Sequence, residues 1–156
     1  MTENHIAGDP RDEYFMGIAL GEAEKAFDEG EVPVGAVIEC GGRIIARAHN
    51  LTERLNDVTA HAEMMAITSA AEALGGKYLP QCTLYVTVEP CVMCAGALGW
   101  SQIGRIVYGT SDPKRGFSKF CSHGTGMLHP KTIVTQGILG DDCAQLMKDF
   151  FSDRRK

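Results

Sequence analysis

The stretch "TLYVTVEPCVMCAGALGWSQIGRIVYG", residues 83–109, decides the fold that we expect for this chain. Residues 83–88 form a nearly continuous apolar and β-branched run, which is typical of a buried strand. A helix is predicted over residues 91–101 and a second strand over residues 105–109. Because a strand–helix–strand crossover within one sheet joins parallel strands, this stretch predicts a parallel pair covered by a helix.

The residues before this stretch predict a helix and a hairpin. Asp9 is a suitable N-cap and Pro10 suits the first helical turn, so a helix is expected to run from there to Gly30. The segments "VGAVIEC" (34–40) and "RIIARAH" (43–49) flank two glycines, which is a strong signal for a β-hairpin. The hairpin is therefore expected to add an antiparallel edge to the sheet.

Four further segments complete the expected order of elements. A second helix is predicted over residues 60–74, a long loop over 110–130, a short last strand over 131–136 and an amphipathic helix over 140–153. The order is then α-β-β-α-β-α-β-β-α. We expect an α/β fold, a three-layer α/β/α sandwich with a central mixed five-stranded sheet.

Length and composition predict one globular domain. The chain has 156 residues, 44% of them hydrophobic and 22% charged, so we expect a single domain over residues 1–156 with flexible ends at 1–11 and 154–156. No apolar run approaches the roughly 20 residues of a membrane span, and the polar N-terminus lacks a secretory signal, which favours a cytoplasmic protein. The net charge of −5 argues against a protein that coats nucleic acid without specificity. It leaves room for a small basic patch that binds one RNA.

Two short motifs carry the residues best suited to bind a metal. The first, "HAEMMA", begins at His61, which follows Thr59 as a suitable N-cap and is therefore expected in the first turn of its helix. The second, "PCVMC", contains Cys91 and Cys94, which share one helical face at i and i+3. One imidazole and two thiolates are typical zinc ligands, and three protein ligands leave a fourth position for water.

Glu63 is placed to move protons rather than to bind the metal. It lies two residues after His61, about 200° around an ideal helix, so both side chains reach one metal only if that metal lies beyond the N-terminal end of the helix. Each feature also has a simpler explanation, because Cys-x-x-Cys is often a structural zinc half-site or a redox pair and a first-turn glutamate often only complements the helix dipole. No second Cys-x-x-Cys or histidine pair completes a closed four-ligand site with finger spacing, so the combination favours catalysis.

The combined pattern resembles the zinc-dependent cytidine/deoxycytidylate deaminase superfamily, in which H-x-E and P-C-x-x-C occur together. Within it the chain looks most like the bacterial tRNA-specific adenosine deaminases, which convert the wobble adenosine of an arginine tRNA to inosine. The similarity covers residues 12–155 and includes the segments "EVPVGAV", "HN", "TAHAEMMAI", "TLYVTVEPCVMCAGAL", "IGRIVYG", "DPKRG", "GIL" and "CAQLMKDFF".

The resemblance implies a hydrolytic deaminase with one zinc ion per subunit. His61, Cys91 and Cys94 would hold the zinc. Glu63 would move protons while water replaces the amino group at C6 of adenine, which releases ammonia. Asn50 is similar in position to the asparagine that hydrogen-bonds the flipped nucleotide in the family. The remaining residues implied at the substrate wall the base pocket or present backbone groups near the purine edge: Pro33, Val34, Val88, Ala62, Glu89 and Pro90.

RNA contacts and partners also follow from the resemblance. Asp112 and Lys114 match positions on a loop that touches the anticodon backbone, and Phe151 matches an aromatic residue near a flanking nucleotide. The simpler explanations are that Asp112 begins a turn and that Phe150 and Phe151 only bury the last helix. The resemblance further implies a homodimer that binds a tRNA anticodon stem-loop and has no association with a membrane.

One segment departs from the family pattern. After "DPKRG" the chain reads "FSKFCSHGTGMLHPKT", where the family has a small-residue segment and a loop that ends in "NH". Phe117 and Phe120 are bulky, and Cys121 with His123 would make a poor second metal site. Because this segment helps to receive the anticodon loop in the family, the departure leaves the substrate open. The alternatives are a deaminase of a free base or nucleoside, such as guanine or cytosine, and a non-catalytic zinc-stabilised RNA-binding protein.

Overall fold

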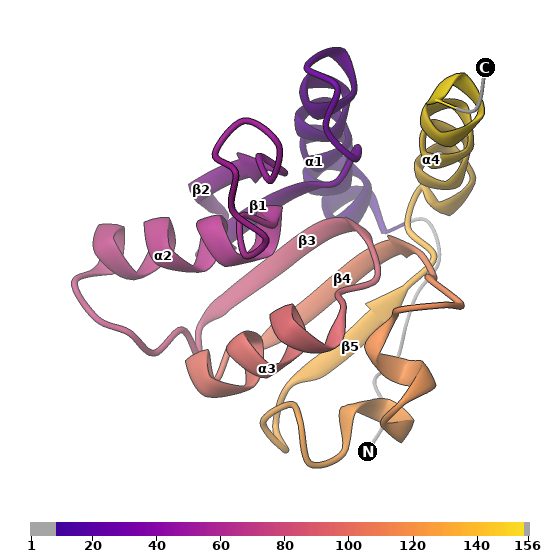
Figure 1. Ribbon diagram of the computed structural model, residues 1–156. Coiled ribbons are helices and arrows are strands. Elements are labelled where there is room, and N and C mark those ends of the chain that lie inside the picture. Colours follow the sequence, from indigo (N-terminus) through magenta and orange to yellow (C-terminus); the bar gives the residue numbers. More distant parts are fainter. Residues whose placement is uncertain (1–8, 155–156) are drawn as a thin grey trace.

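The computed structural model describes residues 9–154, and its helices and strands follow the predicted order (Figure 1). The helices are α1 (Pro10–Asp28), α2 (Ala62–Leu74), α3 (Val92–Ser101) and α4 (Gly140–Arg154). The strands are β1 (Gly35–Cys40), β2 (Arg43–His49), β3 (Cys82–Val88), β4 (Arg105–Thr110) and β5 (Ile133–Gln136). The long loop predicted over residues 110–130 contains two short 3-10 helices, η1 (Phe117–Lys119) and η2 (Ser122–Gly124).

The sheet is mixed, as predicted. Its strand order is β2-β1-β3-β4-β5, in which β1 pairs antiparallel with β2 and with β3, whereas β3, β4 and β5 run parallel. The crossover from β3 through α3 to β4 is the parallel unit predicted from residues 83–109. The hairpin forms an edge of the sheet, and Gly41 and Gly42 adopt positive φ in its turn, where glycine is not strained.

The two faces of the sheet are covered by different helices, because successive side chains along a strand point to opposite faces. Ile38 and Leu84 pack in one apolar cluster with residues of α2 and α3, whereas Val37 and Tyr85 pack in another with residues of α1 and α4. Figure 1 shows the two pairs of helices on opposite sides of the sheet. The prediction of a three-layer α/β/α sandwich is confirmed. Within residues 9–154, no helix is long and apolar enough to cross a membrane.

The ends of α1 are those that the sequence predicts. The Asp9 side chain accepts the backbone N–H of Arg11 at 2.9 Å, and Pro10 occupies the first helical position. The helix ends before Gly30, whose φ of +78° favours glycine. Of the ends expected to be flexible, residues 1–8 and 155–156 lie outside the described residues, whereas Arg11 is helical and α4 extends to residue 154.

The start of α2 differs from the prediction. Thr59 does not cap the helix, because its backbone N–H and its hydroxyl both donate to Oδ1 of Asp57, at 2.8 and 2.7 Å. This local turn uses the hydroxyl that a cap would need. His61 is the N-cap instead, so it lies just before the first turn rather than in it. Cys91 holds the same position before α3.

A buried ion pair ties α1 to the sheet. Asp12 is 2% exposed and accepts two hydrogen bonds from the Arg105 guanidinium, at 2.9 and 2.7 Å, and one from the Tyr85 hydroxyl at 2.8 Å. Arg105 also donates to the Thr135 hydroxyl at 3.1 Å. Because a buried charge without a partner is costly, this group of contacts holds the first helix to β3, β4 and β5.

We predict that Asp12→Ala lowers the free energy of unfolding by about 3 kcal/mol, because it removes the acceptor of the partly buried Arg105 guanidinium and of the Tyr85 hydroxyl. Glu13→Ala, at the exposed neighbouring position, should change that free energy by less than about 0.5 kcal/mol. Urea denaturation followed by circular dichroism measures both. Equal effects of the two substitutions would mean that the ion pair adds no net stability.

Candidate metal centre

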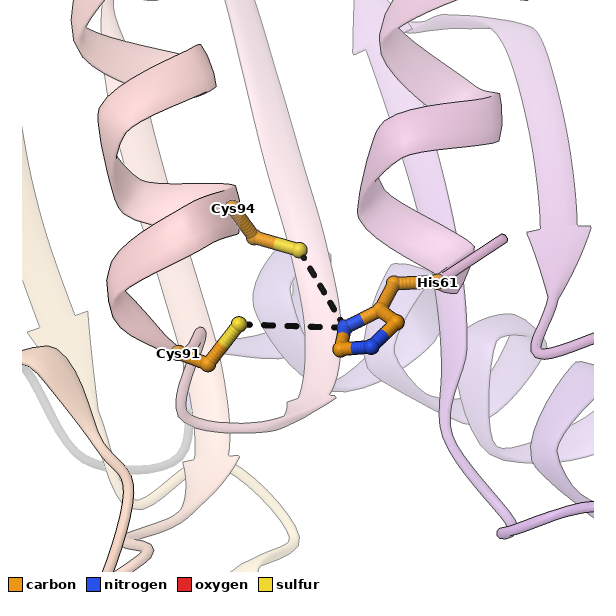
Figure 2. A group of neighbouring side chains, drawn as sticks. All are labelled: His61, Cys91 and Cys94. Atoms are coloured by element: carbon orange, nitrogen blue, oxygen red, sulfur yellow. Dashed lines mark hydrogen bonds between the residues drawn. The ribbon is translucent and has the colours of Figure 1, made fainter. Parts of the chain in front are cut away.

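Figure 2 shows the three predicted ligands facing one point between the starts of α2 and α3. The Nδ1 atom of His61 lies 3.7 Å from the sulfur of Cys91 and 3.5 Å from the sulfur of Cys94. The three ligand atoms all lie within 4.8 Å of one another. The fold thus brings together residues that are separated in sequence by the whole of β3.

These separations suit a tetrahedral zinc ion. Zn–N bonds of about 2.05 Å and Zn–S bonds of about 2.3 Å at a tetrahedral angle place nitrogen and sulfur ligands about 3.6 Å apart. The observed N···S separations of 3.7 and 3.5 Å agree with that value. In the part of the chain that the structure describes, this is the only such group of three or more His, Cys, Asp or Glu ligands, so Cys121 and His123 form no second one. Three ligands leave one position open, as in catalytic zinc sites.

The backbone at both helix starts leaves the ligand side chains free to face a metal. His61 and Cys91 are N-caps, yet neither side chain hydrogen-bonds to its own helix. At α2 the Oδ1 atom of Asn50 accepts the backbone N–H of Ala62 instead, at 2.8 Å. Asn50 therefore performs the capping that the His61 side chain does not, and the imidazole is free to turn toward the two sulfurs.

The ligands are coupled in their acid–base behaviour. A hydrogen bond from Cys94, together with the interaction with His61, lowers the pKa of Cys91 to about 4 against the opposing effect of burial. The pKa of Cys94 is raised, because its thiol bonds to Cys91, is buried and lies beside Glu63. The hydrogen bond with Cys91 also raises the pKa of His61, with burial opposing it. Cys91 is thus ready to act as a thiolate ligand at neutral pH.

Glu63 lies in the first turn of α2 and is 3% exposed. Burial raises the pKa of its carboxyl group to about 7, and the hydrogen bonds that it accepts from its own backbone N–H and from Cys94 oppose this only in part. A carboxyl group that titrates near neutrality can both accept and donate a proton. Glu63 therefore adjoins the ligand group and has the acid–base properties of a proton shuttle.

The predicted walls of a base pocket are buried at the same end of the sheet. β1 and β3 are antiparallel with Ala36 opposite Val86, so the start of β1 lies beside the end of β3. Four residues from these two places are buried: Pro33, Val34, Val88 and Pro90. Ala62, at the start of α2, is fully buried. The structure therefore gathers these residues where β3 leads into the ligand segment.

The predicted RNA-contacting residues come from two parts of the structure, the turn after β4 and helix α4. The Oδ1 atom of Asp112 accepts the backbone N–H groups of Lys114 and Arg115, both at 3.0 Å, so this segment is a turn after β4. Phe151 is 41% exposed and lies on α4, across the sheet from α2 and α3. Phe150 is 5% exposed and packs as a core residue.

Two buried carboxylates hold the loops before α2 and after β4, and the sequence singled out neither side chain. Glu31 is 1% exposed and accepts the backbone N–H groups of residues 53–54 at 3.0 and 2.8 Å. Glu89 is 4% exposed and accepts those of Asp112 and Ser118 at 3.0 and 2.9 Å. The resemblance predicts only backbone groups of Glu89 at the site. For Glu89 the local signal is its place directly after a buried apolar strand, where an unpaired carboxylate is unfavourable.

The segment that departs from the family pattern is partly built into the core. Phe117 is 2% exposed and its ring meets that of Tyr108 edge-on at 6.4 Å, whereas Phe120 is 62% exposed. The Cys121 thiol donates to the carbonyl of Thr125. A pocket of about 790 Å³ lies between this segment and residues of β4 and β5, and none of the three ligands lines it. Only Phe120 of the two bulky residues is therefore available at the surface.

Comparison with known proteins identifies the class. The family model described as the cytidine and deoxycytidylate deaminase zinc-binding region matches residues 9–110, which contain the three ligands and Glu63. A tRNA-specific adenosine deaminase of Aquifex aeolicus is 54% identical over 153 residues, which cover 92% of this chain and 95% of the relative. At this identity the relatedness extends well beyond the zinc motif.

Solved structures agree with this assignment. One from a study of A-to-I editing by tRNA:A34 deaminases at the wobble position of transfer RNA superposes with a TM-score of 0.79 at 46% identity, covering 85% of this chain and 98% of that chain. A guanine deaminase of Bacillus subtilis superposes with a TM-score of 0.62 at 35% identity, covering 74% and 70%. Fold and site together define a zinc-dependent deaminase of the cytidine and deoxycytidylate deaminase class. Within that class, the chain belongs to the family of tRNA-specific adenosine deaminases.

We predict that the purified protein contains about one zinc ion per chain and that Cys94→Ser loses it, because a serine hydroxyl does not replace a thiolate. Cys143→Ser is the matched control, since Cys143 is 1% exposed but packs with α1 residues on the other face of the sheet. Elemental analysis after dialysis measures the zinc content. Full retention of zinc by Cys94→Ser would contradict the ligand set.

Proposed function

We propose that this chain hydrolyses the wobble adenosine of a tRNA, that of an arginine tRNA anticodon in particular, to inosine and ammonia. The observation that carries the proposal is the meeting of three zinc-ligand atoms with a buried glutamate whose pKa is raised to about 7. The family membership supports the same reaction and the same substrate.

His61, Cys91 and Cys94 would hold the zinc, and Glu63 would move the protons. Zinc at such a site acts as a Lewis acid that makes water acidic enough to react near neutral pH. Glu63 would accept the two protons of the attacking water in turn, and deliver one to N1 of the base and the other to the departing amino group. At C6 a C–O bond forms and the C–N bond breaks, so adenosine and water become inosine and ammonia.

Asn50 would hold the flipped nucleotide. Its Oδ1 atom is already used by the backbone N–H of Ala62, so its side-chain NH₂ group is the part that can donate to a substrate. Pro33, Val34 and Val88 would supply apolar walls for the base, and burial of these walls at the ligand end of the sheet supports that role. Backbone groups of Ala62, Glu89 and Cys91 would border the purine edge, and Pro90 would lie beside them.

The segment after β4 would contact the RNA. Lys114, Arg115 and Lys119 are exposed, and cationic side chains of this kind contact phosphates. Phe120 is 62% exposed and could stack on an unpaired base, while Asp112 sets the turn that presents the cations. Phe151, exposed on α4, would meet a nucleotide that flanks the anticodon.

We further propose that residues 1–156 form a single domain that works as a homodimer in the cytoplasm. Two exposed apolar side chains of α3 support the dimer, since Trp100 is 85% exposed and Val92 is 44% exposed. A second copy that covered these side chains would remove them from water. Sedimentation equilibrium of the zinc-loaded protein measures the oligomeric state directly.

The most direct test is incubation of the protein with an arginine tRNA anticodon stem-loop that carries a wobble adenosine. We expect inosine at that position, detected by nuclease digestion and mass spectrometry, and no ammonia from free guanine or cytosine. Ammonia from a free base without inosine in the RNA would favour the alternative of a free-base deaminase. Stem-loop binding with no turnover of any substrate would favour a non-catalytic RNA-binding protein.

We predict that Glu63→Gln keeps the zinc and the fold but slows inosine formation by about 10²–10⁴-fold, because the amide cannot carry the proton. Glu72→Gln, an exposed position on the same helix, is the matched control and should retain full activity. Inosine formation and zinc content are measured on the same preparations. Wild-type rates in Glu63→Gln would rule out the proposed proton transfer.

A further inference from the structure

The side chain of Glu89 makes contacts that the deamination chemistry does not use. Its backbone directly follows β3 and precedes Pro90 and Cys91, so it belongs to the segment that leads into the metal site. Its carboxylate is buried and bonds to the chain that follows β4. Oε1 accepts the backbone N–H of Asp112 at 3.0 Å, and Oε2 accepts that of Ser118 at 2.9 Å. The two oxygens therefore hold both ends of residues 112–118.

Main-chain contacts place the same residues against the ligand segment. The backbone N–H of Phe117 donates to the carbonyl of Pro90 at 3.0 Å, and Cys91 pairs with Gly116 in an isolated antiparallel bridge. A Cβ atom at position 116 would overlap the carboxyl group of Glu89, so only glycine allows this approach. The 112–118 segment thus lies directly beside a predicted zinc ligand.

The segment presents positive charge from a fixed backbone. The Oδ1 atom of Asp112 accepts the N–H groups of Lys114 and Arg115, which closes the turn that carries both residues. Both residues are exposed. The buried carboxylate of Glu89 takes its hydrogen bonds from backbone amides of Asp112 and Ser118, and this leaves the two cationic side chains for an anion outside the chain.

We propose that the Glu89 carboxylate is a positioning residue for the RNA substrate. It fixes residues 112–118 to the ligand segment, and thereby sets the distance between the phosphate contacts of Lys114 and Arg115 and the place where the base reacts. The inference rests on the proposed RNA substrate. Phosphate contacts of this kind bind the RNA equally in the bound substrate and in the transition state, so loss of their fixed position weakens substrate binding without slowing the chemical step.

The link itself is tested by hydrogen exchange of the zinc-loaded protein. Glu89→Gln keeps the size of the side chain and one acceptor oxygen but replaces the other by a donor. It should speed amide exchange in peptides that cover residues 112–118. Glu39→Gln is the matched control, because Glu39 is 5% exposed and accepts the N–H of Gly42 in the β1–β2 hairpin. The control should leave 112–118 unchanged, and equal exchange there in Glu89→Gln and wild type would overturn the proposal.

The kinetic role is tested with the wobble-adenosine stem-loop. We expect Glu89→Ala to raise KM about tenfold and Glu89→Gln about threefold, with kcat and zinc content little changed, because the phosphate contacts weaken while the proton transfer is kept. A purely structural role would instead lower the active fraction and reduce kcat without changing KM. That result would also overturn the proposal.

The most direct test measures whether Glu89 and the two cations, Lys114 and Arg115, affect KM through the same contact. The double substitution Lys114→Ala/Arg115→Ala should raise KM in the wild-type background, but add less than about twofold when Glu89 is already alanine. Fully additive effects on KM would show that Glu89 and the two cations act independently, and would overturn the proposal.

If Glu89→Ala does not fold, the near-isosteric Glu89→Gln decides the same comparison. A wild-type protein that forms no inosine in the stem-loop refutes the proposed function, while hydrogen exchange still decides whether Glu89 holds the segment.

Discussion

The candidate site depends on one constraint, that α2 and α3 begin at neighbouring points on the same face of the sheet. His61 and Cys91 both occupy N-cap positions, where the backbone is still extended and the side chain is not committed to the helix surface. The imidazole stays free because Asn50 caps α2 in its place. The positive ends of two helix dipoles also meet here, which favours thiolates as ligands. The same backbone arrangement thus places the three ligands and supplies part of the positive charge that stabilises the two thiolates.

Three buried glutamates have different environments and different roles. Glu31 and Glu89 each accept two or more hydrogen bonds from loop residues, so their charge is used to hold main chain in place. The pKa of Glu63 is raised to about 7, because burial outweighs the hydrogen bonds that it accepts. A buried glutamate that accepts backbone amides of loop residues thus serves as an anchor, whereas the raised pKa of Glu63 suits it to the proton transfer that we propose.

Features that local contacts determine can be predicted from the sequence, whereas those that depend on distant contacts cannot. Ligand identity, the parallel crossover and the cap of α1 follow from spacing within short segments, and each was predicted. The cap at Thr59 was predicted wrongly, because Asp57 takes that hydroxyl into its own turn. Phe117 and Phe120 look alike in sequence, yet one is 2% and the other 62% exposed. Their difference arises from contacts with β4, which no local pattern records.

The sequence by itself determined the kind of chemistry, because a histidine, a glutamate and a Cys-x-x-Cys pair on two successive helix starts are typical of one zinc reaction. It also determined the layers of the fold, since hydrophobic periodicity decides which faces are buried. Only the tertiary structure decided that Asn50 caps α2, that Glu31 and Glu89 hold the loops before α2 and after β4, and that Phe117 is core. These contacts join residues far apart in the chain. They depend on which strands become neighbours, and the residues near each other in the sequence do not determine that.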